Sequence, residues 1–207
     1  MAINKIIKFL HLAEKLKYEL RHGWTSSGRQ ESVADHSWRV ALLLILSAPH
    51  LNKRFNIEKA LKMAIIHDLV EIYAGDTPFF KITNLSQINN KNKKERKALM
   101  KIKNIMGEEF CKEIIDLWNE FEDVQSYEAK IVKAFDKIEA QIQQNEADFS
   151  TWIDFEIKSA LTYLDPYCRF DTFINSLMVA VRQESIAKMK RHGIIPENIN
   201  NEIKCEI

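Results

Sequence analysis

The chain has 207 residues, of which 46% are hydrophobic and 29% charged, and its formal net charge is +1. This size and composition predict one globular domain, 1–207, with a full hydrophobic core. The near-neutral charge gives no bulk field for a nucleic acid polymer or a membrane surface. No apolar run reaches the ~18 residues that a membrane span needs. Three scattered cysteines without a CxxC pair favour a reducing compartment, so we expect a cytoplasmic protein.

Helical periodicity dominates the chain, and only five glycines and four prolines interrupt it. We therefore predict an all-α fold with long helices and short connections. Ser32 and Asp35 form a capping-box pattern, Asn56 is an expected N-cap, and Gly75 is an expected helix stop. The predicted helices cover about residues 3–20, 32–47, 57–74, 95–106, 108–119, 126–144, 150–164 and 170–190.

Three stretches are predicted to lack regular structure. "RHGWTSSGRQE" (21–31) is a loop with two glycines, 77–97 is a long polar loop or crossing of a kind that is often functional, and the tail 193–207 is loose. Within the second stretch, "NNKNKKERK" lacks the interleaved aromatic residues typical of single-stranded nucleic acid binding. We interpret it as a solvated face from which one lysine could still meet a phosphate.

The stretch "IIHDLVEIYAGD" (65–76) combines polar and apolar residues in an unusual way. His67 and Asp68 are adjacent, and Glu71 follows at spacings of four and three, which places these side chains on one face of a helix. The flanking residues are apolar, and burying an unpaired carboxylate costs several kcal/mol. A divalent cation would remove that cost, because imidazole and carboxylate groups are standard metal ligands.

Two further residues complete the predicted metal site. His36 lies in the first turns of the second predicted helix, and Asp136 lies in "IVKAFDKIEAQI". Together with the His-Asp doublet they offer two imidazoles and two carboxylates from three helices, and they leave positions open for water and substrate. Each has an alternative: His36 as a hydrogen-bonded core histidine, and Asp136 as an ion-pair partner of Lys133 or Lys137.

The ordered set H…HD…D resembles the signature of the HD-domain metal-dependent phosphohydrolases. "ESVADHSWRVALL", "HDLVEIYAGDTP" and "EAKIVKAFDKIE" are similar to the matching blocks of the HD-domain 5′-deoxynucleotidases, over roughly residues 5–145. The resemblance implies an HD-type helical core with additional C-terminal helices (150–190) and a homodimer. It also implies one divalent metal ion, Co²⁺, Mn²⁺ or similar, with Mg²⁺, Zn²⁺, Ni²⁺ or Fe²⁺ as alternatives.

The resemblance further implies a role for each matching position. The two histidines and two aspartates of the signature match the metal ligands. Glu71 matches the acid that orients the attacking water, and Asp76 matches the acid near the leaving 5′-oxygen. The implied substrate contacts are Arg21 and Trp24, with His22 or Arg29 as rivals of Arg21, and Glu120 near the sugar hydroxyl, with Glu122 as its rival.

We therefore expect a metal-dependent phosphohydrolase that dephosphorylates (deoxy)nucleoside 5′-monophosphates. A nucleoside triphosphohydrolase or a cyclic-nucleotide phosphodiesterase on the same scaffold is the enzymatic alternative. A non-catalytic regulator that binds a nucleotide or a metal is the other alternative, against which the presence of Glu71 and Asp76 argues. The apolar face of the helix predicted over 170–190 is the sequence feature that supports the implied homodimer.

Overall fold

The computed structural model describes residues 2–82 and 84–196, and these residues form a helical protein with one small two-stranded sheet. The predicted all-α class is confirmed. No helix in the described part of the chain is both long and apolar enough to cross a membrane. The elements are α1 (Ala2–Ala13), η1 (Glu14–Lys17), β1 (Leu20–Trp24), β2 (Gln30–Ser32), α2 (Val33–Ser47), η2 (Ala48–His50), α3 (Ile57–Ile66), α4 (Glu71–Ala74), η3 (Phe79–Lys81), α5 (Leu85–Met106), α6 (Glu108–Asp123), α7 (Tyr127–Glu146), η4 (Phe149–Thr151), α8 (Asp154–Ser159), α9 (Asp165–Cys168) and α10 (Thr172–Arg191).

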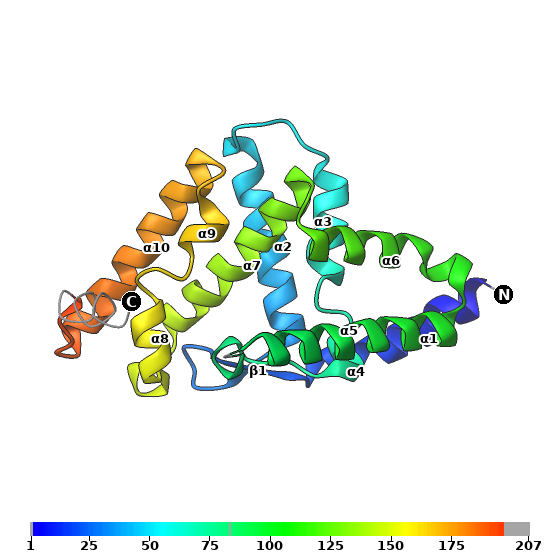
Figure 1. Cartoon of the computed structure of the whole chain (residues 1–207), viewed down its shortest axis with the longest axis horizontal. Coiled ribbons are helices and arrows are strands. Elements are labelled where there is room, and N and C mark those ends of the chain that lie inside the picture. Colours follow the sequence, from blue (N-terminus) through cyan, green and yellow to red (C-terminus); the bar gives the residue numbers. More distant parts are fainter. Residues whose placement is uncertain (1, 83, 197–207) are drawn as a thin grey trace.

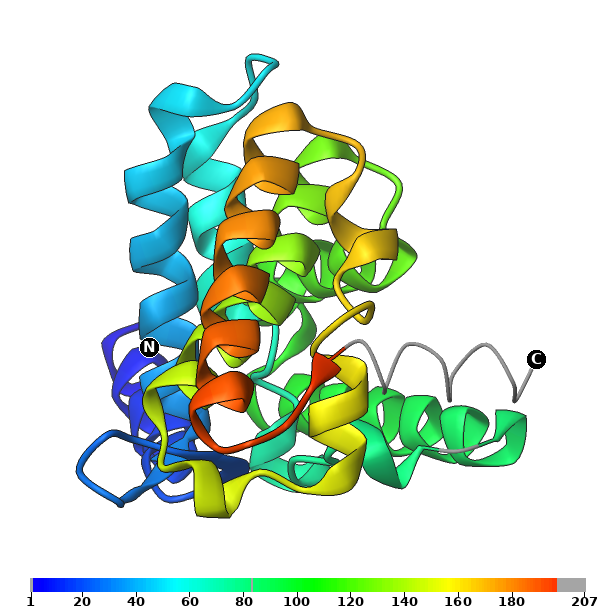
Figure 2. The same cartoon turned by 90° about the vertical axis from the view of Figure 1, so that its left-hand side faces the viewer.

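Helices α2 and α7 pack together at the centre of the molecule, with α3 beside both and α10 on α7 (Figures 1 and 2). The main core fills the space between these four helices, where Leu44, Met63, Phe135 and Ile174 have no exposed surface. The apolar face of α10 belongs to this core. The apolar face on which the sequence analysis based the homodimer is therefore buried in the core of a single chain.

A second core lies between α1, α5 and α6. Ile102 and Met106 of α5 are each only 1% exposed there, and Phe9 meets Phe110 edge-to-face with ring centroids 6.0 Å apart. Gly107, with φ of +89°, ends α5 and lets α6 turn back along it. This second core supports the helices that cover one side of the site.

The predicted helix ends at Ser32, Asn56 and Gly75 are confirmed. Ser32 Oγ accepts a hydrogen bond from the Asp35 amide at 3.2 Å, and Asp35 Oδ2 accepts one from the Ser32 amide at 2.9 Å. Asn56 caps α3, and Gly75 ends α4 with φ of +73°, a conformation that favours glycine. The capping box fixes where α2 begins and so places His36 one turn inside it.

The predicted helix 3–20 and loop 21–31 are wrong in part. The helix ends at Ala13 and continues only as the short η1, and β1 then pairs antiparallel with β2. A turn that includes Gly28, at φ of +83°, joins the two strands. Strands of three and five residues are too short for the alternation of apolar and polar residues to distinguish them from a loop. The hairpin carries Arg21 and Trp24 to the edge of the site.

The predicted helix over 57–74 is interrupted at the His-Asp doublet. α3 ends at Ile66, and the amides of Leu69 and Glu71 then bond carbonyls only three residues back, those of Ile66 and Asp68, each at 3.0 Å. α4 follows from Glu71. The apolar pattern runs through both helices without a gap, so periodicity could not reveal the turn between them.

The predicted loop over 77–97 is largely helical, which corrects the sequence analysis. Asn84 caps α5 by accepting a hydrogen bond from the Gln87 amide at 3.0 Å, and α5 then runs for 22 residues. Burial begins only at Glu95 and Ala98, so the first turns lack apolar periodicity although lysine is a good helix former. α5 packs on α4 and covers one side of the site.

The C-terminal third differs from the prediction in its short elements. The helix predicted over 150–164 is replaced by η4 and α8, and α9 follows. The last helix begins at Thr172, capped by Asp171. Of the predicted loose tail, 197–207 lie outside the described residues, whereas Ile194 packs against the cluster that includes Trp152, and its amide bonds the Met189 carbonyl at 3.0 Å.

Candidate active site

A cavity of about 500 Å³ opens between the hairpin, α4, α5, α7 and α8. Most of the predicted site residues lie on its wall. His36 is instead fully buried beside two of the wall residues, Asp68 and Asp136. Glu120 lies elsewhere on the molecule.

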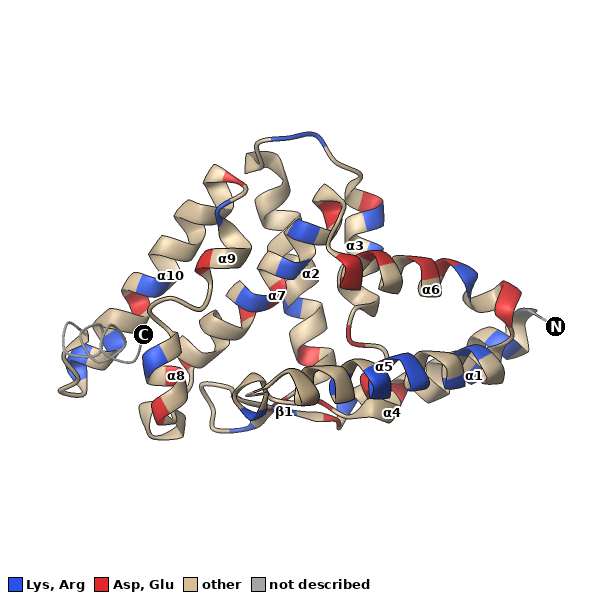
Figure 3. Cartoon of the chain, viewed as in Figure 1, with Lys and Arg blue, Asp and Glu red and all other residues tan. Residues whose placement is uncertain are grey.

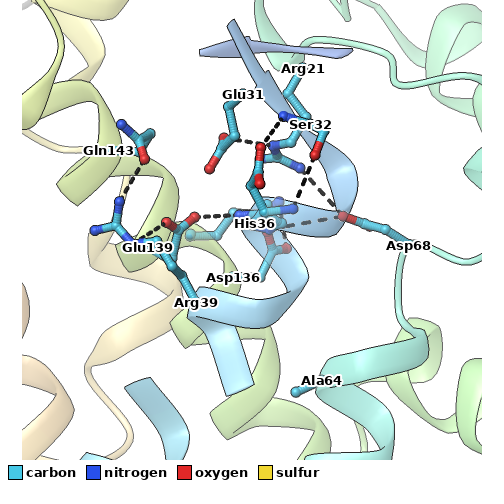
Figure 4. Close-up of polar contacts among 12 residues, drawn as sticks. Arg21, Glu31, Ser32, His36, Arg39, Ala64, Asp68, Asp136, Glu139 and Gln143 are labelled. Carbon is cyan, nitrogen blue, oxygen red and sulfur yellow. Dashed lines mark hydrogen bonds and ion pairs between the residues drawn. The ribbon is translucent and has the colours of Figure 1, made fainter. Parts of the chain in front are cut away.

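Two histidines and two aspartates converge beside this cavity. Figure 4 shows His36, Asp68 and Asp136 of this group. One ligand atom from each of His36, His67 and Asp68 lies within 4.8 Å of the other two. His36 Nε2 is 3.2 Å from Asp136 Oδ1 and 3.9 Å from Asp68 Oδ2, and His67 Nε2 is 3.1 Å from Asp68 Oδ2. The four residues predicted as ligands thus come together from α2, from the turn after α3, and from α7.

His67 presents a nitrogen without a hydrogen-bond partner to this centre. Its Nδ1 donates to the Ala64 carbonyl at 2.8 Å, so a neutral ring carries its lone pair on Nε2. Nε2 is buried, and its neighbour Asp68 Oδ2, at 3.1 Å, is a carboxylate oxygen with no hydrogen to donate to that lone pair. Leaving such an atom unsatisfied costs about 1–3 kcal/mol. A bound cation would remove that cost.

Glu139, which the sequence analysis missed, orients His36. It lies one turn after Asp136 on α7 and accepts a hydrogen bond from His36 Nδ1, while Arg39 Nε lies 3.3 Å from its other oxygen (Figure 4). A carboxylate behind a histidine ligand fixes the ring and directs its other nitrogen to the metal. The sequence signal for this role is only the three-residue spacing from Asp136.

Asp136 makes both of the contacts that the sequence left open. Its Oδ2 lies 2.9 Å from Lys137 Nζ, and its Oδ1 faces His36. Burial raises the pKa of Asp136, but Lys137 and the two histidines outweigh burial and hold the pKa well below its usual range. The ion pair therefore leaves one ionised oxygen turned toward the centre.

The donor set fits a divalent cation, since two imidazoles and two carboxylates form a common mononuclear ligand set. Burial raises the pKa of Asp68, but the neighbouring histidines and Arg21 outweigh it and keep this carboxyl ionised. Burial and Arg21 lower the pKa of His36, but Glu139 and Asp136 raise it to about 9. A metal requires the neutral imidazole, so its binding would release that proton and become tighter as pH rises.

Glu71 and Asp76 bring two carboxyl groups with perturbed protonation to the same cavity. Glu71 is 6% exposed, and its Oε2 is buried with no hydrogen-bond partner among the described residues. Burial, followed by Asp68 and Asp76, raises its pKa well above the usual value. Burial also raises the pKa of Asp76, against Arg21. Carboxyl groups whose pKa is raised in this way are suited to accept and donate protons.

Arg21 is the guanidinium that reaches the centre. Its Nη1 lies 3.3 Å from Asp68 Oδ2, and its Nε lies 3.3 Å from Glu31 Oε2. The rival Arg29 is exposed, pairs with the capping-box aspartate, and does not line the cavity. Glu31, a buried residue that the sequence analysis gave no role, has its pKa raised to about 7 by burial and by Glu139.

An aromatic wall faces these charged groups. Trp24 meets His22 edge-to-face with ring centroids 4.9 Å apart, and His22 meets Phe80 of η3 at 4.7 Å. Phe155 of α8 continues the wall, 6.4 Å from Phe80. His22 also pairs with Glu156 at 3.5 Å. These rings offer aromatic faces and edges against which a planar ring can pack.

The two candidate acids of α6 face different directions. Glu120 lies outside the cavity, where Lys59 Nζ is 2.5 Å from its Oε1. Glu122 lines the cavity and pairs with Lys133 at 3.1 Å. This placement favours Glu122 over Glu120 as a contact of any bound substrate.

Comparison with known families gives the class of this protein. The family described as HD domain matches residues 13–171, which is more than half of the chain. The chain belongs to the HD domain family, as its H…HD…D residues and helical core predict.

The relatives within the family are more specific. The chain is 38% identical over 152 residues to 5′-deoxynucleotidase HDDC2 of Dictyostelium discoideum, covering 70% of this chain and 78% of that protein. It is 33% identical over 146 residues to human 5′-deoxynucleotidase HDDC2, covering 69% and 68%. A crystal structure described as a predicted metal-dependent phosphohydrolase of Magnetospirillum magnetotacticum is 26% identical with a TM-score of 0.77, covering 94% of this chain and 98% of that one.

Proposed function

We propose that the chain hydrolyses nucleoside 5′-monophosphates, deoxynucleotides above all, to nucleoside and phosphate. One divalent cation, Co²⁺ or Mn²⁺, would be held by His36, His67, Asp68 and Asp136. The observation that carries this proposal is the buried, unpartnered Nε2 of His67 within a convergent ligand set. A cavity of about 500 Å³ is a size typical of small-molecule sites. The names of the relatives support the substrate class.

The proton chemistry falls to Glu71 and Asp76. When bound, the cation would polarise a phosphoryl oxygen and lower the pKa of a water molecule to about 7. Glu71 accepts a proton from the attacking water or holds it in line, for which its unpaired Oε2 is available. Asp76 gives a proton to the leaving 5′-oxygen, and burial keeps a fraction of this carboxyl protonated at higher pH than usual.

Binding falls to the cavity walls. Arg21 offers two further guanidinium donors to the phosphate oxygens while its contacts with Asp68 and Glu31 hold it in place. Trp24 provides a face for the base. Glu122 is the acid of α6 that can accept a hydrogen bond from the sugar hydroxyl.

We also propose a cytoplasmic homodimer. Trp38, Leu42 and Ile45 recur at helical spacing on α2 and are 61%, 39% and 51% exposed. A single apolar face of this kind suits a two-fold contact with a second copy. The molar mass of Ile45→Glu in solution, compared with that of the unaltered chain, tests the dimer.

The cysteines support the cytoplasmic location. The free, buried thiols of Cys111 and Cys168 are typical of a reducing compartment.

A substrate panel tests the proposed reaction. Nucleoside mono- and triphosphates and cyclic nucleotides are each incubated with Mn²⁺ or Co²⁺, and a chelator-treated sample is the control. We expect inorganic phosphate from deoxynucleoside monophosphates. Phosphate or pyrophosphate released from triphosphates but none from monophosphates would overturn the proposal. Turnover no higher than that of metal-loaded Glu71→Ala would favour the non-catalytic regulator.

A further inference from the structure

The first half of α5 brings a lysine to the cavity that no motif assigns. Most of the lysines along this half are exposed, whereas Lys91 is partly buried and lines the cavity. Figure 3 shows that basic residues gather along α5 and α1, while acidic residues follow α6. Among the described lysines of α5, Lys91 is the one that lines the cavity, and α5 packs on α4, which carries Glu71.

Glu95 holds Lys91 in place. Lys91 Nζ donates to Glu95 Oε1 at 2.5 Å, one helical turn away. Glu95 is only 6% exposed, and its Oε2 is buried without a hydrogen-bond partner among the described residues. A lysine has three donors, and Glu95 is the only described residue seen to accept from this one. Two N–H groups of Lys91 thus remain for a ligand.

Helix stability does not explain this pair. A lysine four residues before a glutamate is the less favourable order, because it opposes the helix dipole. Burying the Glu95 carboxylate with one oxygen unsatisfied adds a further cost. The same helix has exposed positions where a lysine and a glutamate could pair without burial. The pair is therefore better explained by what Lys91 faces.

Lys91 lines the same cavity as Glu71 and Asp76, the two carboxyl groups to which we assign proton transfer. Burial is the largest influence on the pKa of both Glu71 and Asp76 and raises it, and Arg21 and Lys91 are the cations that oppose it at both. Arg21 approaches from the hairpin and Lys91 from α5. The two cations therefore reach one cavity from two different elements, and the proposed ligands Asp68 and Asp136 line the same cavity.

We propose that Lys91 is a phosphate-binding residue, and that Glu95 is the positioning residue that directs its ammonium group into the cavity. The ligand is the phosphate group of a monoester or free inorganic phosphate, gripped between Lys91 and Arg21. This inference rests on the proposed function for its catalytic consequence, but phosphate binding itself can be measured without turnover.

The test compares Lys91→Gln with Lys94→Gln, which removes the same charge from an exposed position of the same helix. In Mn²⁺-loaded protein, loss of a charged hydrogen bond predicts a fall in kcat/KM of roughly 10- to 100-fold for Lys91→Gln. The inhibition constant of inorganic phosphate should rise by a similar factor, and that of the free deoxynucleoside should stay unchanged. Lys94→Gln should stay within about twofold of the unaltered chain.

Glu95→Gln separates positioning from folding. We expect it to weaken phosphate inhibition less than Lys91→Gln does, and to add nothing when Lys91 is already glutamine. Lys91→Arg should recover part of the phosphate affinity. If Glu95 only stabilises the fold, Glu95→Gln should lower thermal stability and raise the inhibition constants of phosphate and of the deoxynucleoside together. It should do so whether position 91 is lysine or glutamine. That result would overturn the inference.

Calorimetric titration with inorganic phosphate distinguishes the two possible failures. If the unaltered chain cleaves no monophosphate yet binds phosphate more tightly than Lys91→Gln does, the proposed reaction is wrong and the Lys91 site stands. If monophosphates are cleaved and Lys91→Gln matches Lys94→Gln in both phosphate affinity and kcat/KM, the Lys91 site is wrong and the reaction stands.

Discussion

The chain has two buried clusters with carboxylates, one around Asp171 and one around His67 and Asp68, and they differ in how far their hydrogen bonds are satisfied. Where α10 begins, Asp171 is 1% exposed and uses both of its oxygens within the chain. Its Oδ1 accepts from the amides of Phe173 and Ile174 at 2.9 and 3.2 Å. Its Oδ2 accepts from the Asn52 amide at 2.9 Å and the Tyr127 hydroxyl at 2.6 Å. This cluster ties α10 to α7 and to the segment before α3.

The cluster around His67 and Asp68 lacks that closure. His67 Nε2 and Glu71 Oε2 are buried without hydrogen-bond partners among the described residues, and both residues line a cavity. Buried polar groups in folded proteins are nearly always satisfied. A cluster closed by the chain's own donors stabilises the fold, whereas one with unpaired atoms facing a cavity is arranged for a ligand. Substitutions in the two clusters should therefore change different quantities.

The largest expected effect comes from His67→Ala. Because this change removes one of four proposed ligands, metal content and phosphate release should be lost together, while the metal-free protein, although less stable for the loss of a buried side chain, should still unfold cooperatively. Metal analysis and a phosphate assay on the same sample measure both. His11→Ala, at an exposed position, is the control. Full metal occupancy in His67→Ala would contradict the ligand assignment.

Glu71→Ala should separate metal binding from rate. The ligand set stays intact, so metal content should match the unaltered chain, while kcat falls by roughly 10²–10⁴-fold, the usual contribution of a general acid or base. Glu120→Gln is the matched control, since that carboxylate lies outside the cavity. Loss of metal from Glu71→Ala would mean that Glu71 is a metal ligand. An equal loss of rate in Glu120→Gln would mean that Glu120 contributes to the reaction.

The residues of the site were more predictable than the backbone that presents them. His36, the His-Asp doublet and Asp136 could be identified because an imidazole or carboxylate in an apolar helical pattern needs a partner. The break of the helix at Ile66 could not, because apolar residues continue on both sides of it. Glu139 was missed since a second acid three residues after Asp136 has the same pattern as a salt-bridged surface glutamate.

The helix α5 shows why a helical segment can be missed when it lacks an apolar pattern. Its buried apolar positions, Ala98, Leu99, Ile102 and Met106, all lie in its second half, and that half was predicted. The first half has almost no apolar periodicity, and its helical state follows from the Asn84 cap and from propagation of the helix that the second half anchors. A polar stretch held by its neighbours in this way has no signal of its own in the sequence.

Glu139→Gln should have a smaller effect than loss of a ligand. The amide can still accept from His36 Nδ1 but brings no charge, so the imidazole becomes a weaker ligand. Metal affinity should fall about 10- to 100-fold, and rate should recover when more metal is added. Competition with a metal indicator dye measures the affinity. Gln143→Glu, one turn further along α7, is the control for a change of charge near Arg39. Unchanged metal affinity in Glu139→Gln would show that Glu139 does not strengthen His36 as a metal ligand.

Asp171→Asn should have the smallest effect and only on stability. An asparagine oxygen can still cap α10, but the amide group in place of Oδ2 cannot accept from the Asn52 amide or the Tyr127 hydroxyl. Loss of a hydrogen bond to a charged group costs about 1.5–3 kcal/mol. Chemical denaturation of metal-free protein measures this cost. Metal affinity should not change, because the cluster has no contact with the cavity, and a loss of metal affinity would contradict the separation of the two clusters.

The pH dependence of that stability difference tests its origin. Burial raises the pKa of Asp171, but the hydroxyl of Tyr127 and three backbone amides outweigh it and lower the pKa from its usual 3.8. A carboxyl with a lowered pKa in the folded state contributes stability above its unfolded pKa and loses it as pH falls toward the folded value. Asparagine does not titrate, so the stability of the unaltered chain should exceed that of Asp171→Asn most above about pH 5, and the gap should narrow toward pH 3. A gap independent of pH would mean that the charge of Asp171 contributes nothing, and that shape alone makes this cluster structural.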